Sequence, residues 1–152
     1  MTRFAAALLG LGMSALGAIL AISALLPWYS ADLPNRSLSA SGVEGSGELW
    51  MLPIFGAVIL VCGIAVAAHV GSTTREWAGT LCAGAGICAA LVGIRGMSFA
   101  HVEVTIQSGS ETLSTGVAAG TLPVAAVSVG VALGALGVGL YVRRATRRAV
   151  GR

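Results

Sequence analysis

The stretch TLPVAAVSVGVALGALGVGLYVRRATRR, residues 121–148, indicates the class of fold. Its apolar part, residues 122–142, has no charged side chain and offers the ~20 residues with which an α-helix crosses ~30 Å of hydrocarbon. Four arginines follow within residues 143–148. Because a charge inside hydrocarbon is costly, these arginines mark the end of the membrane-embedded part. The stretch therefore predicts a transmembrane helix followed by a basic tail, residues 143–152.

Three more apolar runs of similar length precede this one. In order, they cover residues 4–26, 48–70 and 74–97. The first run has a signal peptide as its alternative, but its apolar stretch of about 23 residues exceeds the ~7–15 residues typical of such peptides. The sequence therefore predicts an all-α membrane protein, a four-transmembrane-helix bundle that forms one domain over residues 1–152, with outer loops at residues 27–47 and 98–121.

Local signals mark the ends of the predicted helices. Pro27 ends the first run, because proline lacks the N–H donor that a helix interior needs. Pro53 falls in the first turn of the second run, where that donor is not needed. Thr73 and Glu76 have the spacing of a capping box at the start of the third run. Thr121 is the expected N-cap of the fourth, with a proline in the turn that follows.

The composition agrees with membrane embedding. Of the 152 residues, 56% are hydrophobic and only 10% are charged, whereas a soluble domain has about 25% charged residues. The mean hydropathy is +0.89. With 22 glycines and many alanines, the apolar side chains are small, which lets membrane helices approach closely.

The charged residues separate into two groups along the predicted topology. One side has a net charge of +6 and contains Arg3, Arg75, Arg143, Arg144, Arg147, Arg148, Arg152 and Glu76. The other has a net charge of −3 and contains Asp32, Glu44, Glu48, Glu103, Glu111, Arg36 and Arg95. Since basic loops stay in the cytoplasm, both ends of the chain are predicted to be cytoplasmic. Aromatic residues mark the two interfaces, Trp28, Tyr29, Trp50 and Phe99 outside, and Phe4, Trp77 and Tyr141 inside.

The second outer loop contains an alternating stretch, HVEVTIQSGSETLST, residues 101–115. Apolar and polar side chains alternate before a Ser-Gly-Ser turn, as in a β-hairpin with one covered face. The first outer loop offers a partner strand in RSLSASGVE. An isolated two-stranded hairpin is marginally stable, so we expect a small extracellular β-sheet built from both loops. The alternative is two irregular loops.

Residues capable of chemistry are few and dispersed. Cys62, Cys82 and Cys88 lie within predicted helices, where cysteine acts as a small packing residue. His69 and His101 have no second metal ligand at a suitable spacing. The central parts of the helices contain no carboxylate, lysine or histidine, although proton relays and ion-coupled transporters use such groups. We therefore expect no catalytic residue, no cofactor, no metal and no nucleic-acid partner.

Arg95 is the most informative single residue. It lies near the outer end of the third run, where a charge needs a partner or must reach the interface. Glu48, at the start of the second run, is a candidate partner, with Glu44 and Glu103 as others. The first interpretation is a structural ion pair or orientation anchor. The second is a contact with a lipid headgroup or a protein partner.

Small residues recur at helical spacing in several runs. Gly130 and Gly134 form a GxxxG motif in the fourth run and continue a series from Ala126. Similar series are Gly10-Ser14-Ala18 in the first run and Gly79-Ala83 in the third. Such faces allow close helix contact, either inside the bundle or against another protein.

The layout resembles two groups of membrane proteins. Trp28 and the segment Gly47-Glu48-Leu49-Trp50 resemble elements of the claudin-type tetraspans, which implies a four-helix bundle capped by an extracellular sheet. Here Glu48 interrupts the element and the outer loops have no cysteine pair, so the resemblance extends to layout only. The stretches LLPWYSA, SGVEGSGELWMLPIFGAVIL and GTLCAGAGICAALVG resemble the small actinobacterial membrane proteins of the tryptophan-biosynthesis-associated type. That resemblance implies location and topology, and it brings no catalytic residues.

Two functions are compatible with this pattern. The first is a non-enzymatic accessory or scaffold subunit of a larger complex in a bacterial plasma membrane. Its partners would be the lipid bilayer and a larger membrane protein, bound through small-residue helix faces or the outer loops. The alternative is a small transporter, channel or lipid-binding module in which Arg95 lines a site.

Overall fold

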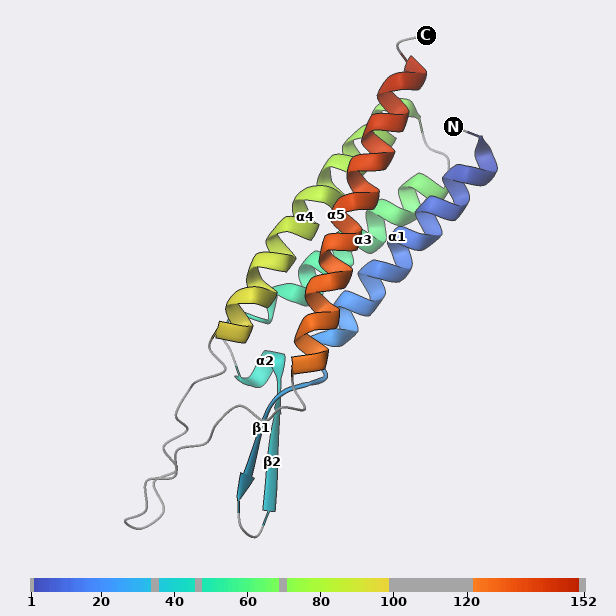
Figure 1. Cartoon of the computed structure of the whole chain (residues 1–152). Helices are drawn as coiled ribbons and strands as arrows, with labels where there is room; N and C mark the ends of the chain where they lie inside the picture. The colour runs from blue at the N-terminus through green and yellow to red at the C-terminus, as the bar shows by residue number, and fades with distance from the viewer. Residues whose placement is uncertain (1, 34–35, 46–47, 69–70, 99–121, 151–152) are drawn as a thin grey trace.

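The computed structural model describes residues 2–33, 36–45, 48–68, 71–98 and 122–150. In chain order the elements are α1 (Arg3–Ser23), β1 (Pro27–Leu33), β2 (Arg36–Ser41), α2 (Gly42–Gly45), α3 (Met51–Ala67), α4 (Ser72–Ser98) and α5 (Leu122–Val150). The four long helices lie side by side, and the β-hairpin projects from one end of the bundle (Figure 1). The start of α1 and the end of α5 lie at the other end, which we call the terminal end (Figure 1).

Three of these helices are long and apolar enough to cross a membrane. They are the spans Arg3–Ser23, Ser72–Met97 and Val124–Ala149. The fourth long helix, α3, has 17 apolar residues and is about 25 Å long at ~1.5 Å per residue. Large apolar side chains are exposed along every long helix, among them Leu11, Val61, Leu91 and Leu133. An apolar exterior of this kind fits a membrane protein.

The helix bounds differ from the predicted apolar runs. The helix α5 continues to Val150, eight residues beyond the predicted end of the fourth run at residue 142. Hydropathy ended that run at the first arginine, but arginine and alanine are good helix formers in water. The helix α1 ends at Ser23, and α3 begins at Met51 after a turn in which the Met51 N–H bonds the Glu48 carbonyl. Pro53 falls in the first turn of α3, as predicted.

The predicted capping box at the start of the third run was wrong. Thr73 lies inside α4, which begins at Ser72, so Thr73 does not precede the helix. The Arg75 N–H donates to the Gly71 carbonyl at 3.1 Å, so the helical hydrogen bonds begin two residues before Thr73. The Glu76 carboxylate instead forms an ion pair with Arg147 of α5. The Glu76 side chain, which the local pattern assigned to the helix cap, therefore makes a tertiary contact with α5. The expected N-cap of α5, Thr121, lies outside the described residues.

Glycines join α1 and α3 into a tight antiparallel pair. A Cβ on Gly17 would lie 2.5 Å from the Gly56 carbonyl oxygen, and one on Gly56 would lie 2.6 Å from the Gly17 carbonyl oxygen. Gly10 and Gly63 are in the same reciprocal contact one heptad away. The Ser14 hydroxyl donates to the Leu60 carbonyl at 3.2 Å across the pair. The backbones touch because no side chain separates them.

A second antiparallel pair joins α4 and α5 in the same way. A Cβ on Gly79 would lie 2.8 Å from the Gly139 carbonyl oxygen, and one on Gly139 would lie 2.7 Å from the Ala83 nitrogen. Further along, a Cβ on Gly86 would lie 2.7 Å from the Ala132 carbonyl oxygen. The predicted Gly79-Ala83 series therefore packs inside the bundle.

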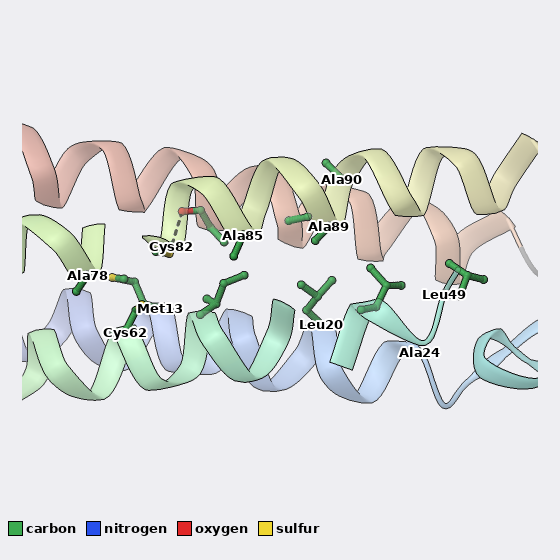
Figure 2. Close-up of a cluster of buried hydrophobic side chains, with 14 of the residues drawn as sticks. Met13, Leu20, Ala24, Leu49, Cys62, Ala78, Cys82, Ala85, Ala89 and Ala90 are labelled. Atoms are coloured by element: carbon green, nitrogen blue, oxygen red, sulfur yellow. Dashed lines mark hydrogen bonds between the residues drawn. The ribbon is translucent and has the colours of Figure 1, made fainter. Parts of the chain in front are cut away.

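The two pairs meet face to face through larger side chains. Figure 2 shows α4 and α5 on one side of this core and α1 and α3 on the other. Met13 and Leu20 of α1 are fully buried here, as are Ile59 and Val66 of α3. The α4 side of the core consists of small residues, namely Ala78, Cys82, Ala85 and Ala89. Large side chains on one pair therefore pack against small ones on α4.

The hairpin is attached to α1 through Trp28. Its strands pair antiparallel from Leu33↔Arg36 at the turn to Pro27↔Ser41 at the base, with an irregularity between residues 27 and 29. The Trp28 side chain is only 3% exposed, and its indole Nε1–H donates to the Ser23 carbonyl at 2.8 Å. The Trp28 indole is therefore buried at the base of the hairpin, and its place at a membrane interface stays a prediction. The alternating stretch 101–115 lies outside the described residues, and an extracellular sheet built from both loops stays a prediction.

Candidate functional site

Arg95 and Glu48 form an ion pair at the hairpin end of the bundle. Arg95 lies in the last turn of α4, and Glu48 lies in the turn before α3. The Arg95 Nε is 2.8 Å from the Glu48 Oε2, and the two side chains are 63% and 42% exposed. Of the three candidate carboxylates, the structure thus places Glu48 against Arg95. An ion pair this exposed contributes about 0–1 kcal/mol, so its energetic weight is small.

A buried contact beside the ion pair holds the two segments together. Leu49 is fully buried, and a Cβ on Gly96 would lie 2.8 Å from the Leu49 Cδ2. Glu48 and Arg95 are the chain neighbours of these two residues. Packing of Leu49 against the bare Gly96 backbone therefore sets the distance between the charged groups. The sequence did not predict this contact, because a leucine and a glycine carry no charge or motif that would indicate a pair.

The two candidate tryptophans occupy different environments. Trp50, directly before α3, is 47% exposed, in agreement with a position at an interface. Trp28 is buried, and a Cβ on Gly42 would lie 2.8 Å from the Trp28 Cδ1. The structure therefore assigns Trp28 to the base of the hairpin and leaves Trp50 accessible.

The predicted GxxxG motif of α5 lies outside the tight helix pairs. Gly130 is exposed, and a Cβ there would meet no atom within 4 Å. A Cβ on Gly134 would meet only the Leu16 side chain of α1, at 3.8 Å. Gly137 is also exposed and open. Among the described residues, the motif therefore makes no close backbone contact.

An apolar groove lies between α1 and α5 near the hairpin. Its volume is about 310 Å³, and its lining residues are Ile19, Ile22, Ser23, Leu26, Val124 and Val127. The single hydroxyl in this lining, that of Ser23, donates to the Leu20 carbonyl at 2.7 Å. The groove therefore offers an apolar surface with its polar group already satisfied, and Arg95 is not part of it.

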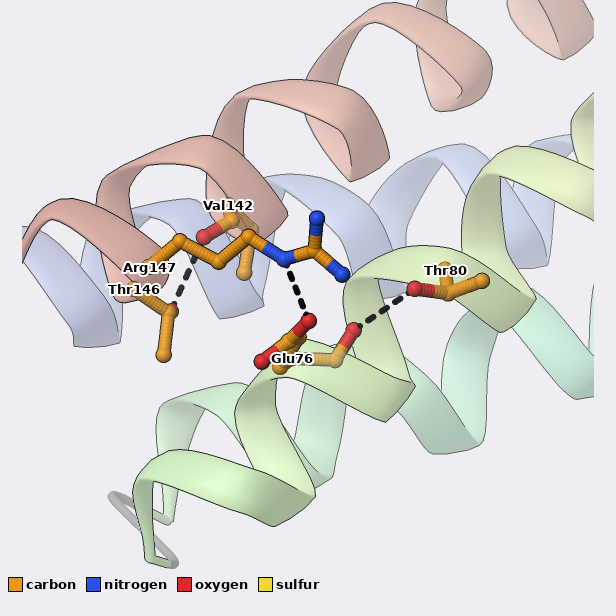
Figure 3. Close-up of polar contacts among 5 residues, drawn as sticks. All are labelled: Glu76, Thr80, Val142, Thr146 and Arg147. Carbon is orange, nitrogen blue, oxygen red and sulfur yellow. Dashed lines mark hydrogen bonds and ion pairs between the residues drawn. The ribbon is translucent and has the colours of Figure 1, made fainter. Parts of the chain in front are cut away.

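A polar cluster that sequence reasoning missed lies at the terminal end (Figure 3). The Arg147 Nε is 2.5 Å from the Glu76 Oε1, so the ion pair joins α5 to the first turns of α4. Nearby, the Thr80 hydroxyl donates to the Glu76 carbonyl and the buried Thr146 hydroxyl donates to the Val142 carbonyl (Figure 3). The signal in the sequence was that Glu76 is the one acidic residue on a strongly basic side.

The three cysteines carry free thiols, and two of them are buried in the core. The Cys82 thiol is buried and donates to the Ala135 carbonyl of α5 at 3.3 Å. Cys62 is buried on α3, and Cys88 is exposed on α4. Among the described residues, no group of three or more His, Cys, Asp or Glu side chains could hold a metal ion.

Comparisons of the chain with protein-family models, with curated proteins and with solved structures give no match. The features available are the Arg95–Glu48 pair, the open glycine face of α5, the α1–α5 groove and the basic terminal end.

Proposed function

We propose that this protein is a non-enzymatic accessory or scaffold subunit of a larger complex in a bacterial plasma membrane. In this proposal all four long helices cross the bilayer, including the shorter α3. Both chain ends are cytoplasmic, and the hairpin and the second outer loop cap the bundle outside. The charge distribution along the sequence and the resemblance to small actinobacterial membrane proteins support this placement.

The open glycine face of α5 is the observation that carries the proposal. A glycine inside a helix costs about 0.5–1 kcal/mol relative to alanine. In the tight pairs, close backbone contact offsets that cost, as for Gly17 against Gly56. Gly130 and Gly137 have no such contact with any part of the chain that the structure describes. A second membrane helix packed on this face would supply it.

The spacing of these glycines favours a helix as the occupant. Gly130 and Gly137 are seven residues apart, like Gly10 and Gly17 in the α1–α3 pair. Both helix pairs of the bundle use a glycine every seven residues for close contact. Among the described helices, the other open glycines are Gly12 and Gly84, and neither has a second open glycine seven residues away. The α5 face is thus the one most similar to the faces that already pair.

Co-purification in mild detergent tests the proposal. The wild-type protein should bring down a membrane protein in constant stoichiometry. Gly130→Leu should abolish this, because a large side chain on the α5 face keeps a partner helix at a distance. Gly12→Leu is the matched control, since Gly12 of α1 is equally open and lies on another face. A monodisperse wild-type homo-oligomer without a partner, or equal losses in both variants, would contradict the proposal.

A lipid-binding module is the second candidate, and the α1–α5 groove favours it. The groove is apolar and of a size that accepts part of an acyl chain. Its place away from Arg95 favours a lipid tail over a charged solute. Mass spectrometry of the purified protein separates the two candidates, because a retained lipid without a protein partner supports this one.

A further inference from the structure

The terminal end of the bundle has an excess of positive charge. Its described arginines are Arg3, Arg75, Arg143, Arg144, Arg147 and Arg148, against the single carboxylate of Glu76. That carboxylate is occupied by Arg147 at 2.5 Å. Among the described residues, the other five arginines have no ion pair. Five guanidinium groups at one end therefore lack a counter-charge within the described part of the chain.

Arg75 is the arginine whose position demands an acceptor. Its Nε is buried and has no hydrogen-bond partner among the described residues. Arg75 adjoins Glu76, which pairs with Arg147, and precedes Gly79 by one turn. A Cβ on Gly79 would lie 2.9 Å from the Arg143 backbone nitrogen. Arg75 thus lies beside the arginine segment of α5. A buried N–H without an acceptor is costly, so an anion that enters the junction of α4 and α5 would stabilise the half-buried Arg75 guanidinium.

The exposed face of α5 leads from apolar residues to arginines. Along this face lie Leu133, Gly137, Tyr141, Arg144 and Arg148, all exposed and three or four residues apart. The helix α4 is antiparallel to α5. Toward the terminal end, its exposed Leu81 and Trp77 therefore come before Arg75, in the same order of apolar residues and then arginine. Exposed aromatic residues occupy the boundary between acyl chains and headgroups. In the membrane placement proposed above, the arginines next to Trp77 and Tyr141 lie at the depth of the lipid phosphates.

We propose that Arg75, Arg143 and Arg144 bind the phosphate of an anionic lipid headgroup at the junction of α4 and α5. The planar guanidinium forms paired hydrogen bonds with phosphate oxygens, and the inner leaflet of a plasma membrane is rich in anionic lipids. The alternative is that these arginines only orient the protein in the membrane. Solvated arginines suffice for that role, and it leaves the buried Arg75 Nε without an acceptor. The headgroup site rests on the membrane embedding proposed above.

Lipid titration of the purified protein in uncharged detergent tests this site, with native mass spectrometry as the readout. Phosphatidylglycerol should bind more tightly than phosphatidylcholine. Arg75→Gln and Arg144→Gln should each weaken phosphatidylglycerol binding about fivefold, from ~1 kcal/mol per basic residue at the membrane surface. Arg3→Gln is the matched control, because it removes one charge from the same end but from α1, and it should change binding less than about twofold.

Three results would overturn the headgroup site. They are an equal loss in Arg3→Gln, no preference for phosphatidylglycerol, and displacement of the lipid by soluble glycerol phosphate at equal concentration, which would make free phosphate the ligand. Circular dichroism checks folding, and if Arg75→Gln unfolds, the exposed Arg144 carries the test. Partner co-purification is measured separately, so a failed headgroup site and a failed accessory function are distinguishable.

Discussion

At the scale of single residues, glycine has two distinct roles in this chain. Gly17 is buried, and its missing side chain lets the α1 backbone touch α3 at the Gly56 carbonyl. Gly12 lies less than two turns away on the same helix, yet a Cβ there would meet nothing within 4 Å. The same residue type is therefore indispensable at one position and unconstrained at the other, and the difference lies in the neighbouring helix.

Replacing Gly17 with alanine should destabilise the bundle. The new methyl group would lie 2.5 Å from backbone atoms of Gly56 and Leu60, so α1 and α3 must move apart. We expect a loss of about 1–3 kcal/mol, typical of an overpacked core. Gly12→Ala should be neutral or stabilise by up to about 1 kcal/mol through helix propensity. Unfolding in detergent, followed by circular dichroism, measures both; an unchanged stability in Gly17→Ala would contradict the close contact.

At the scale of elements, the junction between α1 and the hairpin depends on one side chain. The carbonyl of Ser23, at the end of α1, accepts the Trp28 indole N–H at 2.8 Å. At the start of α2, directly after β2, the Gly42 N–H donates to the Leu26 carbonyl at 3.3 Å, and Gly42 packs on the indole ring. Trp28 therefore both satisfies a helix-end carbonyl and fixes where the hairpin begins.

Trp28→Phe should weaken this junction. The ring stays in place, but the Ser23 carbonyl loses its shorter hydrogen bond and keeps only the Leu26 N–H at 3.3 Å, which costs about 1 kcal/mol. Trp50→Phe is the control, since Trp50 is 47% exposed and its replacement should change the stability by less than about 0.5 kcal/mol. The thermal midpoints of the two variants in detergent give the comparison. Equal midpoints would mean that the indole N–H does not stabilise the junction.

At the scale of the whole molecule, the bundle is assembled from two glycine-based pairs. Buried positions repeat every seven residues, as in residues 10 and 17 of α1 and residues 132 and 139 of α5. Such a repeat keeps one face of each helix toward its partner along the full length. The pairs α1–α3 and α4–α5 then join through the larger side chains of the central core. Positive charge gathers at one end of this assembly.

The charge distribution predicts the orientation of the whole molecule in the membrane. In a variant without the three native cysteines, Ser39→Cys in β2 should react with an impermeant thiol reagent in intact cells. Ala149→Cys, exposed at the end of α5, should react only after the membrane is opened. Position 149 is chosen because the nearby Thr146 is only 3% exposed, so a cysteine there would be shielded by the protein itself. The reverse labelling pattern would contradict cytoplasmic chain ends.

The sequence by itself determined the helical class and the approximate position of each long helix. Apolar runs and helix-breaking prolines are local properties, so they can be found without knowing the neighbours. The end of α5 was missed by eight residues because hydropathy reports the limit of an apolar run, whereas backbone hydrogen bonding continues through arginines. The series Gly79-Ala83 was recognised as a packing face for the same local reason, namely its spacing.

Only the tertiary structure decided which faces meet and which stay open. Gly130 and Gly79 both belong to small-residue series, yet one is exposed and the other touches Gly139. Trp28 is buried and Trp50 is accessible, although both lie near the predicted outer end of an apolar run. Spacing along a helix fixes which residues share a face, but it does not fix the rotation of that face toward a neighbour. That rotation depends on how all four helices fit together. The sequence of a single helix therefore does not determine it.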